Sequence, residues 1–186
     1  MERRPAEFLV TPFHVGVGSN ISPEENVVDA LAQLQRTVDV TAVSPFYWSA
    51  AVGPNGQKSG QSPFLNGVFV CQSAMDATTF KFNVLRPVEA ALGRVRTADK
   101  FADRALDLDI LLWGSHIVEG GALRIPDPDI WKRPFVALPL FDVTGNIQLP
   151  GDDRCLKDVL DALDISGMRR DDLVTERLQR ELERKG

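Results

Sequence analysis

The order of secondary-structure signals along the chain predicts an α+β fold with an antiparallel sheet. Segments with strand-like and helix-like composition follow one another as β-α-β-β-α-β through residue 113. That order is the ferredoxin-like pattern, in which helices pack on an antiparallel sheet. The chain has 186 residues, 44% of them hydrophobic, which suits one domain with a substantial core.

The first strand is predicted at residues 13–17, directly before a Gly-Ser-Asn loop. A helix should follow, because Ser22 is a capping residue type, Pro23 suits the first turn and a glutamate stands three positions after the cap. Two stretches rich in β-branched and aromatic residues predict the second and third strands, at 38–48 and 64–70.

Residues 50–63 contain three glycines and two prolines and predict a long loop, a feature that is often functional. A second helix is expected from Asp76, a capping residue type, to about residue 92. Pro87 lies inside this helix and should kink it or remove one backbone hydrogen bond. The short apolar run at 106–113 then predicts a buried strand.

Beyond residue 113 the pattern is less regular. The charged segment at 171–185 carries a loose apolar stripe, which is typical of a solvated helix, an interaction helix or a frayed end. We expect an N-terminal extension at 1–12, one domain at 13–165 and a charged C-terminal helix or tail at 166–186. The remaining predicted elements are a small hairpin at 117–125, a proline-rich loop at 126–134, a helix at 135–141 and a short helix at 156–163.

Composition excludes several classes of protein. The formal net charge of −5 argues against a general nucleic-acid binder. Cys71 and Cys155 stand far apart without a metal-type spacing, and Cys71 lies in an apolar run typical of a core. The sequence contains neither a run of membrane-spanning length nor an N-terminal cleavage pattern, so a cytoplasmic location is expected.

The chemistry is concentrated around Asp107 and Asp109. On a strand these two side chains point to the same face, where two unpaired carboxylates would repel each other. A divalent metal with oxygen ligands would satisfy them, and phosphates would complete its coordination shell. A solvent-facing edge strand is the structural alternative. Four basic residues stand just ahead of the pair and favour the phosphate interpretation: Arg94, Arg96, Lys100 and Arg104.

The standard nucleotide motifs are absent from the sequence. A P-loop would need glycines at Gln57, just before Lys58, and at Val52. A dinucleotide fingerprint fails because its third glycine would fall at Ile21. No serine lies in a nucleophile-elbow pattern. The reaction class that remains is metal-assisted phosphoryl transfer. It requires alignment and charge neutralisation rather than a protein nucleophile.

In its ordered motifs the chain resembles the 6-hydroxymethyl-7,8-dihydropterin pyrophosphokinase family. The resemblance implies a three-layer α/β/α form of the ferredoxin-like fold. It also implies transfer of pyrophosphate from ATP to the hydroxymethyl group of the pterin, with release of AMP. The implied partners are small molecules, without nucleic acid or membrane. The matching blocks lie at 15–20, 44–53, 63–66, 92–96, 104–111, 125–126, 133–136 and 139–140.

Roles for individual residues follow from the resemblance. Asp107 and Asp109 would bind two Mg²⁺ ions, while Arg94 and Arg104 would stabilise the transferring group. Phe64 and Phe135 would sandwich the pterin ring, and Asn66 would read its amide edge. The substrate pocket implied in this way comprises Gly18, Ser49, Val52, Phe64, Asn66 and Phe135. The residues implied to lie against ATP are Glu89, Arg96, Lys100 and Arg133.

The chain departs from the family pattern in two places near the phosphates. Ala102-Asp103 stands where the family usually has Gly-Pro, and Asp127 stands where it often has His. These departures leave alternatives open: a divergent member that acts on another small alcohol, a pterin-binding protein without catalysis, or a generic ferredoxin-like interaction domain.

Overall fold

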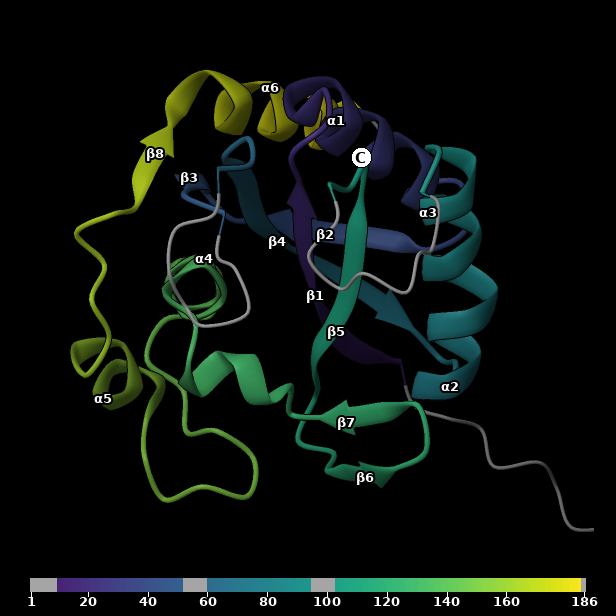
Figure 1. The fold of residues 1–186 in the computed structure, drawn as a ribbon. Helices are drawn as coiled ribbons and strands as arrows, with labels where there is room; N and C mark the ends of the chain where they lie inside the picture. The colour runs from purple at the N-terminus through teal and green to yellow at the C-terminus, as the bar shows by residue number, and fades with distance from the viewer. Residues whose placement is uncertain (1–9, 52–59, 95–102, 185–186) are drawn as a thin grey trace, which may run out of the picture.

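The computed structural model describes residues 10–51, 60–94 and 103–184. Within these ranges a six-stranded sheet has the order β5-β1-β4-β3-β8, with β2 also paired to β4, and every pairing is antiparallel (Figure 1). The strands of this sheet are β1 (Thr11–Ser19), β2 (Asp39–Val43), β3 (Phe46–Ser49), β4 (Phe64–Ser73), β5 (Asp107–Trp113) and β8 (Arg169–Asp171).

The helical elements connect and cover the strands. The second predicted helix is composite, with a π-helical turn, η1, between two α-helical pieces. A small hairpin, β6 (Val118–Gly120) and β7 (Leu123–Ile125), confirms the predicted one. The helical elements are α1 (Pro23–Leu34), α2 (Ala77–Phe80), η1 (Lys81–Leu85), α3 (Arg86–Ala91), the 3₁₀ helix η2 (Pro128–Trp131), α4 (Pro134–Thr144), α5 (Leu156–Asp161) and α6 (Asp172–Glu183).

Two hydrophobic clusters hold the fold together, because alternate side chains of a strand face opposite sides of the sheet. Leu108 and Ile110 of β5 belong to the larger cluster, which includes buried residues of α1 and α6. Leu111 belongs to the second cluster, with Leu140 of α4 and Leu156 of α5. The protein is thus a mixed α and β structure built on an antiparallel sheet, as predicted. No helix in the described ranges is long and apolar enough to span a bilayer.

The predicted strand at 38–48 is wrong as one element, since it divides into β2 and β3 at Ser44 and Pro45. Ser44 exchanges hydrogen bonds with Val68 through its backbone N–H, which donates at 2.9 Å, and its hydroxyl, which accepts at 2.8 Å. Pro45 has no N–H to continue a ladder. A side chain therefore replaces the strand pairing at the break.

The predicted cap of α1 is also wrong. Ser22 has a φ of 39° and makes no side-chain capping hydrogen bond, although Pro23 does begin the helix. The backbone N–H groups of Asn20 and Ile21 donate to the carbonyl of Arg104, which fixes the direction in which the chain enters the helix. This long-range contact cannot be seen in a local motif.

Pro87 changes the second helix without ending it. Asp76 caps the helix as expected, accepting from the N–H of Thr79 at 2.9 Å. Because Pro87 cannot donate to the preceding turn, one hydrogen bond is lost, and the helix widens into the π turn η1 just before it. The wide turn carries Lys81, whose side chain reaches the site described below.

The C-terminal segment is part of the sheet. β8, which the sequence did not predict, pairs with β3, and α6 lies beside α1 (Figure 1). The apolar stripe of α6 is buried rather than solvated, since Val174 and Leu178 belong to the larger cluster. β3 is therefore not an edge of the sheet, because it is paired on both sides, with β4 and with β8.

Candidate active site

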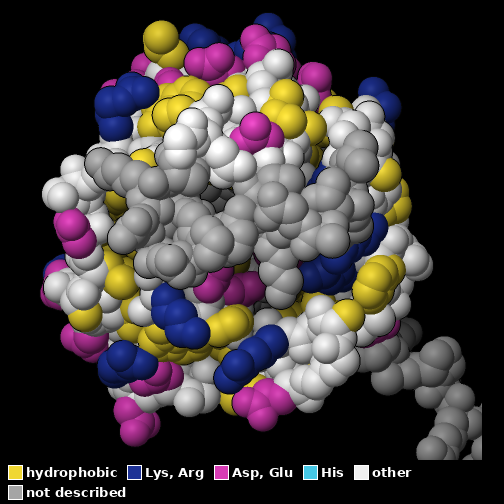
Figure 2. All heavy atoms as spheres, viewed as in Figure 1, with side chains coloured by type: hydrophobic (Ala, Val, Ile, Leu, Met, Phe, Trp, Pro, Cys, Tyr) yellow, Lys and Arg dark blue, Asp and Glu magenta, His cyan; other side chains and the backbone are white. Residues whose placement is uncertain are grey.

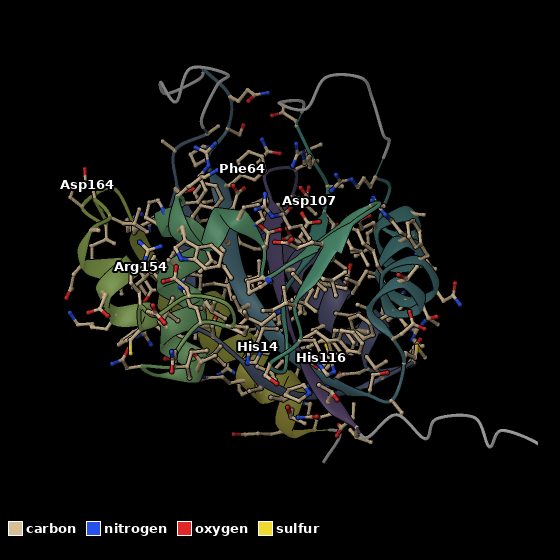
Figure 3. The ribbon with its side chains drawn as sticks, turned by 90° about the horizontal axis from the view of Figure 1, so that it is seen from below. His14, Phe64, Asp107, His116, Arg154 and Asp164 are labelled. Carbon is tan, nitrogen blue, oxygen red and sulfur yellow. The ribbon has the colours of Figure 1, made fainter. Side chains whose placement is uncertain are left out.

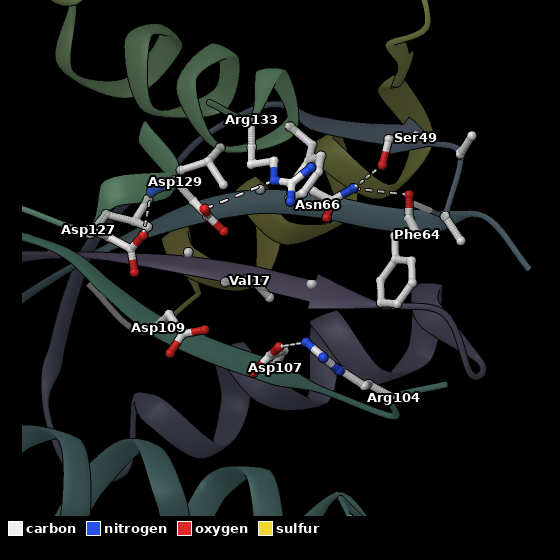
Figure 4. A pocket seen from close by; sticks show the side chains of 18 of the residues that line it. Val17, Ser49, Phe64, Asn66, Arg104, Asp107, Asp109, Asp127, Asp129 and Arg133 are labelled. Atoms are coloured by element: carbon white, nitrogen blue, oxygen red, sulfur yellow. Dashed lines mark hydrogen bonds and ion pairs between the residues drawn. The ribbon is translucent and has the colours of Figure 1, made fainter. Parts of the chain in front are cut away.

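A cavity of about 270 Å³ opens beside β1, β4 and β5 under the start of α4 (Figure 4). On this face acidic side chains lie at the centre, with Lys and Arg side chains around them (Figure 2). Nine predicted site residues line it: Gly18, Ser49, Phe64, Asn66, Arg104, Asp107, Asp109, Arg133 and Phe135. Three others, Val52, Arg96 and Lys100, lie outside the described residues.

Asp107 and Asp109 share one face of β5, as the strand period predicts. They lie opposite Gly18 and Gly16 of β1 in the strand register. A Cβ on Gly16 would come within 3.1 Å of the Leu111 side chain, so a larger residue would be crowded there. The two glycines leave the space above the carboxylates open.

Protein cations meet both carboxylates. Arg94 and Arg104 each donate to Asp107, and the second pair is drawn in Figure 4. Arg94 also donates to the carbonyl of Leu106 at 2.9 Å. The Lys81 ammonium lies 3.3 Å from Asp109 Oδ1. The positive charge that the sequence required beside the pair is thus supplied from within the chain.

Glu89 lies behind this arrangement and does not line the cavity. Its side chain is 2% exposed, accepts from the Leu108 N–H at 2.9 Å and pairs with Arg86 and Arg94, each at 3.2 Å. Burial raises the pKa of Glu89 to about 7, against the opposing effects of the Leu108 hydrogen bond and Arg94. The structure gives Glu89 the role of holding Arg94, while contact with ATP stays a prediction.

Two further carboxylates line the cavity, Asp127 and Asp129. Asp127 caps η2, accepting from the Asp129 N–H at 2.8 Å, and burial raises its pKa to about 6. Partial burial of the half-exposed Asp109 side chain, together with the negative charge of Asp107, also raises the pKa of Asp109. Negative charge is therefore disfavoured at these positions until more positive charge arrives.

This donor set fits magnesium. Mg²⁺ prefers oxygen ligands, is commonly held by one or two carboxylates, and completes its shell with water and substrate phosphates. No group of three or more histidine, cysteine or acidic side chains forms a ready metal cage among the residues described. Two carboxylates on one strand face match a metal that arrives with phosphates. The histidines lie elsewhere, since His14 and His116 sit toward the other end of the strands from Asp107 and Phe64 (Figure 3).

The opposite wall of the cavity is built around Asn66. Its amide nitrogen donates to the carbonyls of Tyr47 and Phe64, at 3.3 and 3.1 Å, and to the Ser49 hydroxyl at 3.0 Å. Carbonyl oxygens can only accept, so the nitrogen must face them and the amide oxygen remains for a ligand. Phe64, from the start of β4, and Phe135, from the first turn of α4, line the same cavity.

The backbone of Arg104 is anchored by Asn20. The Asn20 amide oxygen accepts from the Arg104 N–H at 2.7 Å, and its nitrogen donates to Asp103 Oδ1 at 2.5 Å. The Ser19 hydroxyl adds a bond to the Ala105 carbonyl at 2.6 Å. Asp103, a departure from the family pattern, is thus bonded to the residue that directly follows β1.

Sequence reasoning missed Lys81, Asn20 and Asp129 as residues of the site, and treated Asp127 only as a departure. The Asp-Pro-Asp triplet at 127–129 was a local signal for the two carboxylates. For Asn20 the only signal was its place at the end of the matching block at 15–20, and for Lys81 there was none, because both reach the site through contacts between distant segments.

The fold and the cavity define a class of protein: an α+β domain that binds small molecules in a site lined by acidic and basic side chains. The family model for 7,8-dihydro-6-hydroxymethylpterin-pyrophosphokinase matches residues 14–145. The chain belongs to this family.

Curated relatives agree. A Pseudomonas aeruginosa protein named 2-amino-4-hydroxy-6-hydroxymethyldihydropteridine pyrophosphokinase is 33% identical over 165 residues, which cover 87% of this chain and 98% of that protein. A Haemophilus influenzae protein of the same name is 34% identical over 141 residues, covering 74% of this chain and 84% of that protein.

A solved structure shows the same fold. The Plasmodium falciparum HPPK-DHPS crystal structure with pteroate matches with a TM-score of 0.64 at 11% identity. The match covers 89% of this chain and 47% of the other, so the chain spans about half the length of that larger protein.

Proposed function

We propose that this chain transfers the pyrophosphoryl group of ATP to the hydroxymethyl oxygen of 6-hydroxymethyl-7,8-dihydropterin, for folate synthesis. The bond between the β-phosphorus and the α,β-bridging oxygen breaks, the hydroxymethyl oxygen bonds to the β-phosphorus, and AMP and the hydroxyl proton leave. One observation carries the proposal: the carboxylate pair and the Phe64–Asn66 wall, from separate strands, line one cavity. Membership in the family supports the same activity.

The pterin would lie against the wall that contains Phe64, Asn66 and Phe135. Two aromatic faces suit a flat heterocycle. The Asn66 oxygen, left over from its bonds to the protein, would accept from a ring N–H or amino group. Gly18, Ser49 and Val52 would shape the rest of this pocket.

ATP would lie across the acidic and basic side of the cavity. Asp107 and Asp109 would hold two Mg²⁺ ions, which when bound would neutralise phosphate charge and help align the two substrates. Arg94 and Arg104, now on Asp107, would be released toward the transferring group as its negative charge moves. Arg96, Lys100 and Arg133 would hold the remaining phosphates, and Glu89 would lie near ATP.

The same chemistry requires no covalent intermediate on the protein. Two bound molecules react directly once they are aligned. Water must be excluded from the site, because ATP hydrolysis is the competing reaction. We also infer that the helices on the sheet form the three-layer ferredoxin-like arrangement, which is supported by two separate hydrophobic clusters that both include residues of β5.

A coupled assay of AMP formation tests the activity. Wild-type protein with ATP, Mg²⁺ and hydroxymethyl-dihydropterin should release AMP, and omission of the pterin should abolish it. No AMP above background with all three present would overturn the proposal. Calorimetry with the pterin in the same preparation would then identify a binding protein without turnover.

A further inference from the structure

Lys81, which belongs to η1 and not to the strand β5 that carries the carboxylate pair, lies beside Asp109. The Lys81 side chain is only 11% exposed, and its Nζ lies 3.3 Å from Asp109 Oδ1, whereas the Asp109 side chain is 49% exposed. Lysine is rarely buried unless its ammonium is paired. The burial therefore directs this charge toward one particular carboxylate.

The π turn explains how Lys81 reaches Asp109. It is the first residue of η1, the widened turn ahead of Pro87, and η1 packs against β5. π turns inside α-helices are found frequently at functional sites. The lysine is thus placed by a local irregularity of the helix.

Lys81 faces a cluster of negatively charged side chains. Besides Asp109, its charge lowers the pKa of Asp127, which burial and the charges of Asp109 and Asp129 raise. Asp107 is met instead by Arg94 and Arg104. Among the described residues, Lys81 is therefore the cation that forms an ion pair with Asp109.

We propose that Lys81 is a resident counter-ion of the metal site, which holds Asp109 while no divalent cation is bound and competes with the cation for it. The inference rests on the proposed function, because that function makes Asp109 a metal ligand. The competition would weaken binding of a free divalent cation. A cation that arrives on nucleotide phosphates brings negative charge of its own, which would offset the lysine.

Binding of Mn²⁺ without nucleotide, measured by electron paramagnetic resonance, tests the proposal. Removal of a unit charge a few ångströms from the ion should tighten Mn²⁺ binding by on the order of tenfold in Lys81→Met. Lys81→Arg keeps the charge and should bind Mn²⁺ as weakly as the wild type. Lys157→Met is the matched control, since it removes another lysine–aspartate pair, formed with Asp161 on the exposed side of α5.

Equal or weaker Mn²⁺ binding in Lys81→Met would overturn the proposal. Should this variant unfold, as seen by circular dichroism in chelator, Lys81→Gln takes its place with the same expectation. The two proposals fail separately. AMP formation by the wild type together with unchanged Mn²⁺ affinity in the variant removes the counter-ion alone. Tighter Mn²⁺ binding in the variant without AMP formation by the wild type removes the transfer activity alone.

Discussion

The Thr175 hydroxyl accepts the backbone N–H of Phe46 at 3.0 Å, across 129 residues of sequence. Both groups are buried, and the contact joins α6 to β3. β3 in turn supplies the Ser49 hydroxyl and Tyr47 carbonyl that orient Asn66. The C-terminal segment therefore supports one wall of the candidate pterin pocket.

Thr175→Val should destabilise the protein by about 1–3 kcal/mol, because the isosteric change leaves the Phe46 N–H buried without an acceptor. Urea unfolding at equilibrium measures the loss. Thr41→Val, at an exposed position of β2, is the control and should change stability by less than about 0.5 kcal/mol. Equal stability of the Thr175 variant and the wild type would show that the contact contributes nothing.

Gly67→Ala should be strongly destabilising. A Cβ at this position of β4 would lie 2.3–2.5 Å from atoms of the Phe46 ring, which is fully buried. Overpacking of this kind costs about 1–3 kcal/mol or more. Thermal unfolding of Gly67→Ala beside Gly60→Ala checks this, because a Cβ on Gly60 would meet no atom of the described residues within 4 Å. Similar melting temperatures for the two variants would argue against the packing described.

His14 should make the protein sensitive to acid. Burial lowers the pKa of His14 to about 4, and its Nδ1 has no partner among the described residues. Between pH 6.5 and 4 the unfolded chain therefore binds a proton that the folded chain does not, so stability falls as pH falls through this window.

His14→Phe removes that proton, so from pH 7 to pH 5 the variant should lose roughly 1–2 kcal/mol less stability than the wild type. Urea midpoints at the two pH values measure this difference. Glu89 and Asp127 also titrate near this range, but both proteins contain them, so their contributions cancel. His116→Gln, at an exposed ring, is the control. Parallel pH profiles for His14→Phe and wild type would contradict the assignment.

Phe64→Ala should weaken pterin binding about tenfold and leave ATP binding within about twofold, because the ring lines only the wall assigned to the heterocycle. Calorimetric titration with each ligand separates the two effects. Phe82→Ala removes an exposed ring on η1 and should alter neither affinity. Equal losses for both ligands would mean that Phe64 supports the fold rather than one substrate.

Local patterns predicted much of the fold. Alternation placed Asp107 and Asp109 on one strand face, and a capping residue with apolar periodicity located the composite helix after Asp76. The sequence did not predict β8, because three polar residues form a strand only where β3 offers an edge. Nor did it predict that the apolar stripe of α6 would be buried, since α1, β2 and β3, which are distant in sequence, supply the surface that covers it.

In the site, too, local motifs predicted the lining residues but not the long-range contacts that hold them. Residues in sequence motifs, such as Asn66 and Arg104, do line the cavity. The sequence did not show how they are held, because the partners are distant: Asn20 anchors Arg104 across 84 residues, and Lys81 meets Asp109 across 28. Asp103 and Asp127 stood out only as departures, and their contacts depend on the folded chain.

The carboxylate pair carries the central claim, and AMP formation by Asp107→Asn and Asp109→Asn tests it most directly. Each substitution keeps the shape of the side chain while removing the charge that would hold the metal. We expect both variants to fold, to bind the pterin as the wild type does, and to release AMP at least about a hundredfold more slowly at saturating ATP and Mg²⁺. Wild-type rates of AMP release in both variants would contradict the account.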